Sequence, residues 1–135
     1  MRKRTKAREL ALKFLYQIDI TKEDSSTVLS HFWQEHRAAK PVKEFTTQII
    51  QVALANLPQI DSLISKYAQN WQLKRMAVID RNILRLACCE LLFLEEIPSK
   101  VSINEAVELA KKYGGVESSK FVNGILDKIH KAECR

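Results

Sequence analysis

The sequence predicts an all-α protein of about seven helices in a single domain, residues 1–135. The chain has only three Gly and three Pro among its 135 residues, so it lacks the residues that the tight turns of a hairpin-rich β fold require. Apolar residues recur three and four positions apart along nearly the whole chain, which is typical of amphipathic helices. A composition that is 46% apolar supports one buried core, and the length excludes a multidomain protein.

Four helices are predicted in the first half of the chain. The first covers residues 5–19 and has a basic N-terminal end. A short polar segment follows, and either Ser25 or Ser26 can cap the second helix. Pro41 suits the first turn of the third helix, and Pro58 ends that helix and begins the fourth. The residues predicted to face the core are Ala7, Ala11, Phe14, Ile18, Val28, Leu29, Phe32, Trp33, Val42, Phe45, Ile49, Val52, Ala53, Ile60, Leu63, Ile64 and Tyr67.

The segment 76–94 is predicted to be the central helix. Fourteen of its nineteen residues are apolar, and a helix that is apolar around most of its circumference is packed by neighbours on several sides. Three of its polar residues, Arg81, Asn82 and Arg85, fall on one narrow stripe.

Two further helices are predicted after Pro98. Ser102 and Glu105 have the spacing of a capping box, which indicates a helix start. Gly114 is predicted to end that helix in the left-handed conformation. The last helix then begins at Ser118 or Ser119, either of which can cap it.

Nearly all of the net charge lies at the N-terminus. Residues 1–15 hold six basic residues against the single acid Glu9, so they carry +5 of the chain's net charge of +6. Bases packed this closely repel one another, and phosphate groups relieve that repulsion. We predict that this arm, residues 1–8, binds RNA, because arginine-rich segments are common RNA readers. The alternatives are a terminus that serves only solubility and a mitochondrial transit or membrane-surface helix, which Glu9 and a thin apolar stripe disfavour. The bases of the arm are Arg2, Lys3, Arg4, Lys6 and Arg8.

The common motifs of enzymes, metal sites and membrane segments are missing. The sequence has no GxGxxG, P-loop, GxSxG or HExxH motif, so we expect no catalytic residue, cofactor or metal. His31 and His36 diverge by about 140° on a helix, and Cys88 and Cys89 are predicted to be core residues of a protein of the reducing cytoplasm. No apolar run approaches the roughly 18 residues that span a bilayer, and the basic start leads into Glu9 rather than into a secretory signal.

A second candidate contact for RNA lies near the start of the last helix. Lys120 and Phe121 are adjacent, and a base beside an aromatic ring can hold a phosphate while the ring stacks on a nucleobase. The periodicity of the last helix also allows Phe121 to be a core residue.

Several stretches of the chain match one protein family closely. They are residues 83–87 (ILRLA), 90–92 (ELL), 97–98 (IP), 103–111 (INEAVELAK) and 120–127 (KFVNGILD), together with 7–12 (ARELAL) and 15–17 (LYQ). Through these motifs, and over essentially its full length, the chain resembles the bacterial transcription antitermination factors of the NusB family. The strings INEAVELAK and KFVNG in this order are the most specific, and residues 21–69 are much less diagnostic.

The resemblance implies an all-helical fold of two small bundles and a cytoplasmic, non-catalytic factor. Such a factor pairs with NusE, a ribosomal protein of the small subunit, and recognises boxA-type single-stranded RNA. It acts in the antitermination complex of RNA polymerase, especially in ribosomal RNA operons. By matching positions, Arg2, Arg4, Lys6 and Arg8, with a second patch of Arg85, Glu117, Lys120 and Phe121, face the RNA, and Tyr16 and Asp80 meet NusE.

The chain departs from the family pattern at two positions. Thr5 interrupts what is often a denser arginine run, and Cys89 stands where the family commonly places an aromatic residue. Two other functions stay open. One is the NusB-like domain of a ribosomal RNA cytosine methyltransferase, although we expect no room for its cofactor-binding domain in a chain that ends at Arg135; the other is a basic scaffold or chaperone without sequence preference. The sequence also leaves open whether the free protein is a monomer or a homodimer.

Overall fold

The computed structural model describes residues 2–69 and 71–134, and within them the protein is all-α, as predicted. These residues form seven α-helices and one short 3₁₀ helix, joined by short loops. The elements are α1 (Lys3–Thr21), α2 (Ser25–Glu35), α3 (Lys40–Ala55), α4 (Leu57–Tyr67), η1 (Leu73–Arg75), α5 (Val78–Phe93), α6 (Ser99–Gly114) and α7 (Val116–Glu133).

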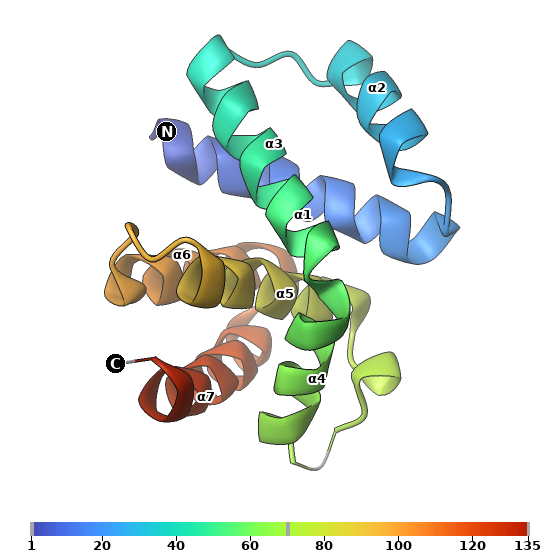
Figure 1. The fold of residues 1–135 in the computed structure, drawn as a ribbon. Coiled ribbons are helices and arrows are strands. Elements are labelled where there is room, and N and C mark those ends of the chain that lie inside the picture. The colour runs from blue at the N-terminus through green and yellow to red at the C-terminus, as the bar shows by residue number, and fades with distance from the viewer. Residues whose placement is uncertain (1, 70, 135) are drawn as a thin grey trace.

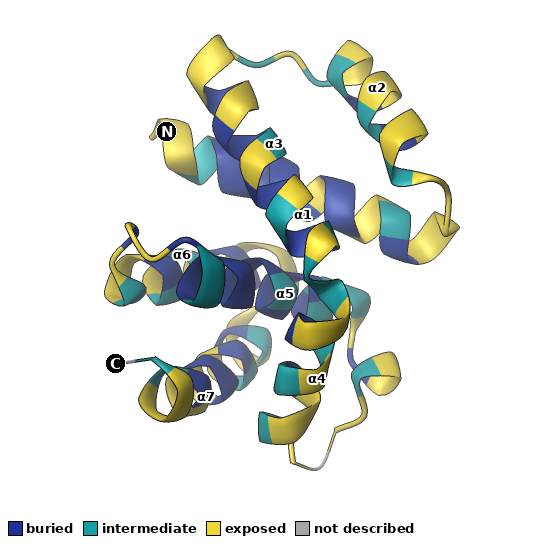
Figure 2. Ribbon diagram, in the orientation of Figure 1, coloured by how far each residue is buried: buried dark blue, intermediate teal, exposed yellow. Residues whose placement is uncertain are grey.

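The helices form two groups that share α5. Helices α1, α2 and α3 lie together at one end of the molecule, and α4, α5, α6 and α7 lie together at the other (Figure 1). Helix α5 packs against both groups, since it contacts α1 and α3 as well as α4, α6 and α7. Ten of its sixteen residues are buried, and Figure 2 shows buried residues along α5 and the middle of α1. The prediction of a central helix is confirmed.

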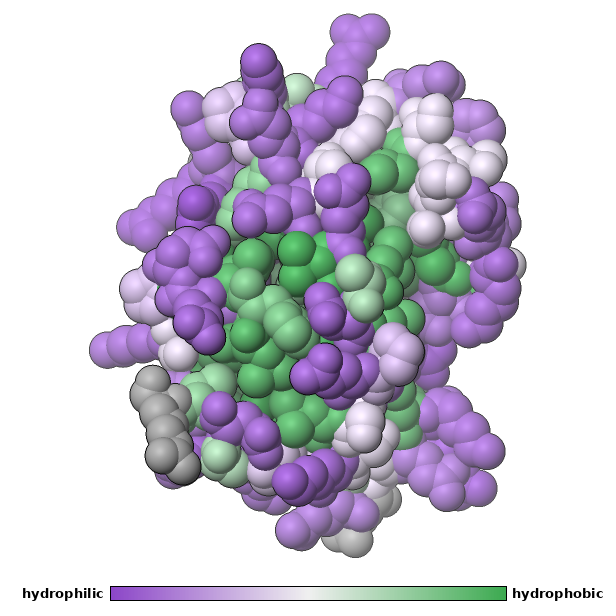
Figure 3. All heavy atoms as spheres, viewed as in Figure 1, coloured by the Kyte–Doolittle hydropathy of each residue, from purple (hydrophilic) through white to green (hydrophobic). Residues whose placement is uncertain are grey.

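One continuous hydrophobic core joins the two groups. Most of the residues predicted to face it are buried, including Phe14, Ile49, Ile60 and Ile64. On the face shown in Figure 3, apolar atoms gather over the middle of the molecule, and polar side chains surround them. The core therefore comes close to the surface where the two groups meet.

Cys88 and Cys89 are fully buried in this core, as predicted. Burial raises the pKa of the Cys88 thiol far above its ordinary value, and it raises the pKa of Cys89 to about 12. Both groups therefore stay protonated thiols at neutral pH. Since the thiolate is the reactive form of cysteine, they act as small apolar side chains.

The start of α2 differs from the prediction. Asp24, rather than Ser25 or Ser26, is the N-cap residue, and its carboxylate accepts a hydrogen bond from the backbone N–H of Thr27 at 3.1 Å. The same carboxylate also accepts bonds from the hydroxyls of Ser26 and Thr27. A carboxylate at the N-terminus is also favoured by the helix dipole.

The capping box predicted at Ser102 is wrong. Helix α6 begins one turn earlier, at Ser99, with Pro98 in the N-cap position. Ser102 is buried within the helix, and its hydroxyl donates to the Glu90 carboxylate at 2.8 Å. A buried carboxylate needs hydrogen-bond donors, so Ser102 serves α5 instead of the end of its own helix.

The turn between α6 and α7 is shifted by one residue from the prediction. Gly115, and not Gly114, has a positive φ, of 92°. Gly114 is the last residue of α6, and a Cβ built there would lie only 2.3 Å from the Ser118 hydroxyl. Neither Ser118 nor Ser119 is the N-cap, because α7 already begins at Val116. Two glycines are thus needed for different reasons, one for its backbone conformation and one for close packing.

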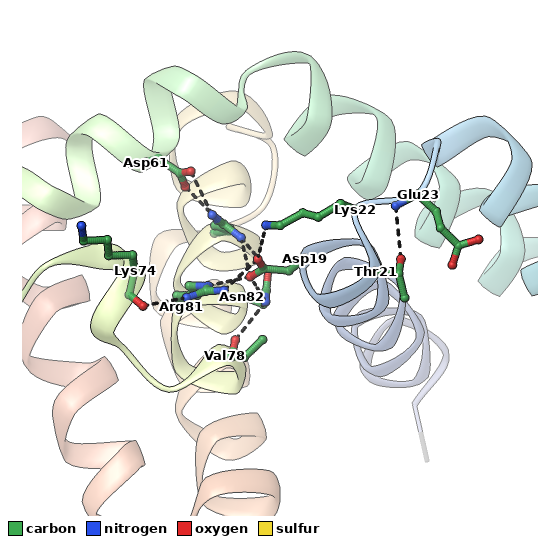
Figure 4. Close-up of polar contacts among 10 residues, drawn as sticks. Asp19, Thr21, Lys22, Glu23, Asp61, Lys74, Val78, Arg81 and Asn82 are labelled. Atoms are coloured by element: carbon green, nitrogen blue, oxygen red, sulfur yellow. Dashed lines mark hydrogen bonds and ion pairs between the residues drawn. The ribbon is translucent and has the colours of Figure 1, made fainter.

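The polar stripe of α5 binds a buried carboxylate of α1. Asp19 has a side chain that is only 4% exposed, and it accepts hydrogen bonds from Arg81 at 2.6 and 2.8 Å, Asn82 at 2.8 Å and Arg85 at 2.9 Å (Figure 4). Arg85 also donates two bonds to Asp61 of α4, at 2.8 and 2.9 Å. The cluster therefore ties α1, α4 and α5 together.

The ionisation of Asp19 is coupled to folding. Burial alone would raise the pKa of this carboxyl, but hydrogen bonds from Arg81 and Asn82 and the charges of Arg85 and Arg81 hold its pKa well below the ordinary value. The charged form is therefore stabilised in the folded state. A carboxyl with a lowered pKa contributes stability at all pH values above its ordinary pKa, and the contribution is lost as the pH falls below that value.

We expect Asp19→Asn to lower the free energy of unfolding by about 3 kcal/mol at neutral pH, because it leaves the buried ends of Arg81 and Arg85 short of a counter-charge. Urea unfolding followed by circular dichroism measures this loss. The variant should also lose stability less steeply than the native protein as the pH falls below 3.8, the ordinary pKa of the replaced group. An unchanged acid dependence would contradict this coupling. Lys22→Gln, which removes an exposed partner of the same carboxylate, is the control and should change stability little.

Candidate nucleic-acid interface

The basic arm is the first part of α1 rather than a separate tail. Helix α1 starts at Lys3, and Arg2 is its N-cap residue. Arg2, Lys3 and Arg4 are exposed and Lys6 is partly exposed, and the start of α1 is drawn as exposed in Figure 2. The Arg4 guanidinium lies over the Phe45 ring of α3, 4.3 Å from its centroid. These four cations are therefore presented on an ordered helical turn, at one end of the molecule.

Arg8 is the exception among the bases of the arm. It is 3% exposed, and it donates to the two Glu90 oxygens at 2.8 and 2.7 Å and to Glu105 at 3.2 Å. Thr5 donates to the same Glu105 carboxylate at 2.6 Å. Burial by itself lowers the pKa of Arg8, but the hydrogen bonds and charges of Glu90 and Glu105 outweigh it and raise the pKa. The guanidinium stays charged and paired.

The expectation that Arg8 lies on the surface with the other bases of the arm is wrong. Its donors already point at two carboxylates inside the protein, and withdrawing them would leave the buried Glu90 carboxylate without its counter-charge. Thr5 also has a clear place, since it binds the neighbouring carboxylate of α6. The residue that interrupts the arginine run thus helps to hold the arm against α6.

The second predicted patch is split by the structure. Arg85 is engaged with Asp19 and Asp61, so its guanidinium is not free. Glu117 and Lys120 are on α7 with side chains 91% and 71% exposed, and their charged groups are 3.8 Å apart. Phe121 is partly buried and packs against the core. Glu117, Lys120 and Phe121 are therefore the accessible part of this patch, and Arg85 acts mainly within the fold.

Trp71 connects the two parts of this patch, and sequence reasoning missed it. The residue is 54% exposed, and its ring meets the Phe121 ring edge to face, with the centroids 5.7 Å apart. Trp71 and Gln69 line both the cleft that contains Arg85 and the shallow cleft that contains Phe121. A tryptophan in a polar segment between two helices does not belong to the apolar face of either helix. In the sequence, this position was the available signal that Trp71 could serve a surface contact.

Tyr16 lines an apolar cleft on another surface. The ring is 39% exposed, and the cleft has a volume of about 550 Å³. Its walls come from α1, from the start of α5 and from the end of α6. A cleft of this kind is suited to apolar side chains of another protein. The residues that line it are Leu12, Lys13, Tyr16, Ala77, Val78, Ile79 and Tyr113.

Asp80 is not the exposed carboxylate that a rim contact would need. The residue is only 9% exposed, and its Oδ1 atom is buried without a hydrogen-bond partner among the described residues. It lies in the first turn of α5 close to the end of α6, since a Cβ at Gly114 would be 3.5 Å from Oδ1. Packing of α6 over this turn covers the side chain.

Other kinds of site are missing from the described part of the chain. Among residues 2–69 and 71–134 no three His, Cys, Asp or Glu side chains are grouped so that they could hold a metal ion. None of the helices described is both long and apolar enough to cross a membrane.

Residues 5–131 match the family model described as the NusB family. This chain belongs to the NusB family. A transcription antitermination protein NusB from Anaeromyxobacter sp. (strain Fw109-5) is 48% identical over 94% of this chain and 89% of its own length. One from Chloroherpeton thalassium is 46% identical over 92% of this chain, which spans only 59% of that longer protein. The relatives are named as antitermination proteins, in agreement with the expectation of a non-catalytic factor.

Solved NusB structures have the same fold. T. maritima NusB is 44% identical, with a TM-score of 0.90, and the match covers 98% of this chain and 93% of that one. A second structure is described as antitermination factors NusB and NusE in complex with double-stranded RNA; it is 32% identical, with a TM-score of 0.89 and 98% of each chain covered. The predicted NusB-like fold of two small helical bundles is confirmed.

We expect Arg8→Ala to destabilise the protein much more than Arg4→Ala. Arg8→Ala should lower the free energy of unfolding by about 3–5 kcal/mol, because Glu90 then stays buried without its counter-charge. Arg4→Ala removes only an exposed base stacked on Phe45 and should cost less than about 1 kcal/mol. Denaturant unfolding of the two variants measures both values. Equal stabilities would show that Arg8 is not a structural residue.

Proposed function

We propose that this NusB-family protein is a transcription antitermination factor that, together with NusE, binds boxA-type single-stranded RNA in ribosomal RNA operons. The observation that carries the proposal is the set of four accessible cations at the start of α1, Arg2, Lys3, Arg4 and Lys6. The solved complex of a 32% identical NusB with NusE and double-stranded RNA supports the pairing with NusE and the binding of RNA. The protein would act in the cytoplasm, within the antitermination complex of RNA polymerase.

In this proposal the start of α1 supplies affinity rather than sequence preference. Basic side chains that neutralise phosphates release condensed counterions, and this term is largely independent of sequence. Because the four cations lie on a helix that is held down by the buried Arg8, little ordering has to accompany binding. Base discrimination then falls to Lys120 and Phe121 on α7, with Glu117 available to accept a hydrogen bond from a base edge.

The apolar cleft around Tyr16 is the proposed site for NusE. Tyr16 and Tyr113 offer large rings with polar tips, a residue type enriched in the centres of protein interfaces. Asp80 follows Ile79 of this cleft in the chain, but its Oδ1 atom is buried beneath the end of α6, so it would shape the cleft rather than contact NusE directly. A homodimer that used the same cleft would compete with NusE.

The arm predicts a definite salt dependence of RNA binding. With about four phosphate contacts, the logarithm of the affinity should fall with the logarithm of salt concentration at a slope near −3, on the rule of about −0.7 per contact for single strands. Replacing Arg2, Lys3, Arg4 and Lys6 together by Ala should flatten the slope markedly. Fluorescence anisotropy of labelled boxA RNA with NusE measures the slope at several salt concentrations.

The control variant for this experiment removes a similar number of cations from positions away from the arm. Lys40→Ala, Lys43→Ala and Lys131→Ala remove exposed cations of α3 and α7, and we expect their combined variant to keep the native slope. A quadruple arm variant with undiminished salt dependence would contradict the assignment of the arm to RNA. Circular dichroism should show native helix content in both variants.

We expect Tyr16→Ala to weaken NusE binding by about thirtyfold, the effect of removing one aromatic residue from the centre of an interface. Val101→Ala is the control, since Val101 is an apolar residue of similar exposure that lies beside the arm. Isothermal titration calorimetry in the absence of RNA separates this effect from RNA binding. Native affinity in Tyr16→Ala would place NusE on a different surface.

A further inference from the structure

We propose that Trp71 is a base-stacking residue, which receives one unpaired nucleobase of single-stranded RNA in the shallow cleft between α4 and α7. The inference rests on the proposed function and assigns one step of RNA recognition to a residue in the loop after α4. The cleft has a volume of about 260 Å³. Its lining residues include Trp71, Phe121, Gly124, Lys120 and Lys128.

The two aromatic rings leave surface available for a base. Trp71 and Phe121 meet at an interplanar angle of 77°. An edge-to-face contact uses only the edge of one ring and one face of the other. Trp71 remains 54% exposed although it makes this contact. Phe121 is itself packed against the core, so it supports the exposed ring of Trp71 in a defined position. A preformed aromatic surface of this kind binds bases with little loss of conformational entropy.

Gly124 keeps the floor of the cleft open. A glycine inside a helix costs about 1 kcal/mol relative to alanine, and a closely packed neighbouring backbone is one reason to keep it. Gly124 has no such neighbour, since no atom of another element lies within 4 Å of a Cβ built there. The residue is exposed in the middle of α7 and lines the cleft. The missing side chain leaves space beside Phe121 rather than room for another helix.

Cations flank the aromatic surface on both sides. Lys120 and Lys128 are exposed and lie eight residues apart on α7, which is about 12 Å along the helix axis. Phe121 and Gly124 are between them in the sequence. The cleft that adjoins at Trp71 is lined by Lys22 and Lys74 as well. A base that stacks on Trp71 would therefore have its flanking phosphates near positive charge.

This combination favours a nucleic-acid strand over a protein partner. The apolar surface here is small, whereas a stable protein interface needs about 800 Å² on each partner. An aromatic ring with lysines on either side has the composition of single-strand binding grooves, in which stacking tolerates any base and the cations follow the backbone. Two of the acids nearby are engaged, since Asp127 pairs with Lys131 and Glu133 with Lys66.

The test measures binding of single-stranded boxA RNA to the protein with NusE present. Trp71→Ala should weaken RNA binding about tenfold, the effect of one lost stacking contact, while Trp71→Phe should keep most of the affinity. Gly124→Leu fills the cleft without altering either ring and should weaken binding to a similar extent as Trp71→Ala. Because Trp71 and Gly124 are both exposed, these variants are expected to fold.

A spectroscopic measurement separates stacking from a general loss of affinity. The chain has two tryptophans, so Trp33→Phe leaves Trp71 as its only tryptophan. Its fluorescence should be quenched when RNA is added, after subtraction of the signal of the double variant Trp33→Phe/Trp71→Phe. Trp33→Phe itself is the control for a change of aromatic residue far from the cleft and should bind RNA with native affinity.

Each failure has a distinct meaning. If the native protein with NusE binds no RNA, both the proposed function and this inference are overturned. If the native protein binds RNA with the expected salt dependence but Trp71→Ala binds equally well and Trp71 fluorescence does not change, the stacking inference alone is overturned. If Trp71→Ala weakens NusE binding in the absence of RNA, Trp71 belongs to a protein interface and the inference is again overturned.

Discussion

The structure depends on buried charges that fix α1 against α5. Near the start of α1, Arg8 binds Glu90 and Glu105; near its end, Asp19 binds Arg81 and Arg85. A buried charge without its partner costs several kcal/mol, so these pairs admit only one position of the two helices along each other. Apolar packing alone is more tolerant of small shifts. The ion pairs therefore determine how the two helical groups are joined.

This constraint also decides what reaches the surface. Because Arg8 is held inside, the preceding residues continue the same helix and present Arg2, Lys3, Arg4 and Lys6 on an ordered turn. At the other end of α1, Arg85 is held by Asp19 and Asp61 and neutralised. The accessible cations at the start of α1 and around the cleft of α7 are thus distinct from the arginines that hold the fold together. Paired arginines build the scaffold, and the accessible cations of the arm and α7 remain for a polyanion.

Three surfaces of different chemistry result. The start of α1 is cationic, the cleft around Tyr16 and Tyr113 is apolar, and the cleft around Trp71 and Phe121 combines aromatic rings with lysines. An antitermination factor of the proposed kind has to hold an RNA backbone, a protein and a few bases at once. Separate surfaces on a rigid helical body allow the three contacts to form without competing for the same residues.

The sequence by itself determined the helices, the central position of α5, the burial of Cys88 and Cys89 and the cationic start of the chain. These properties follow from composition and from spacings of three and four residues, which are local. The family motifs added the fold of two bundles and the candidate site residues. Capping was less accurate, since Ser102 and Ser119 have hydroxyls that suit a helix start but bind elsewhere.

Only the tertiary structure decided which charged residues are inside. Arg8 and Glu90 are 82 residues apart in the chain, and Trp71 and Phe121, whose rings are in contact, are 50 residues apart. No local pattern distinguishes Arg8 from Arg4, because both are bases near the start of one amphipathic helix. The difference arises from the carboxylates that α5 and α6 bring to one of them. Residue spacing therefore defines the face of a helix, and the long-range pairing of charges defines whether a residue on that face is available for function.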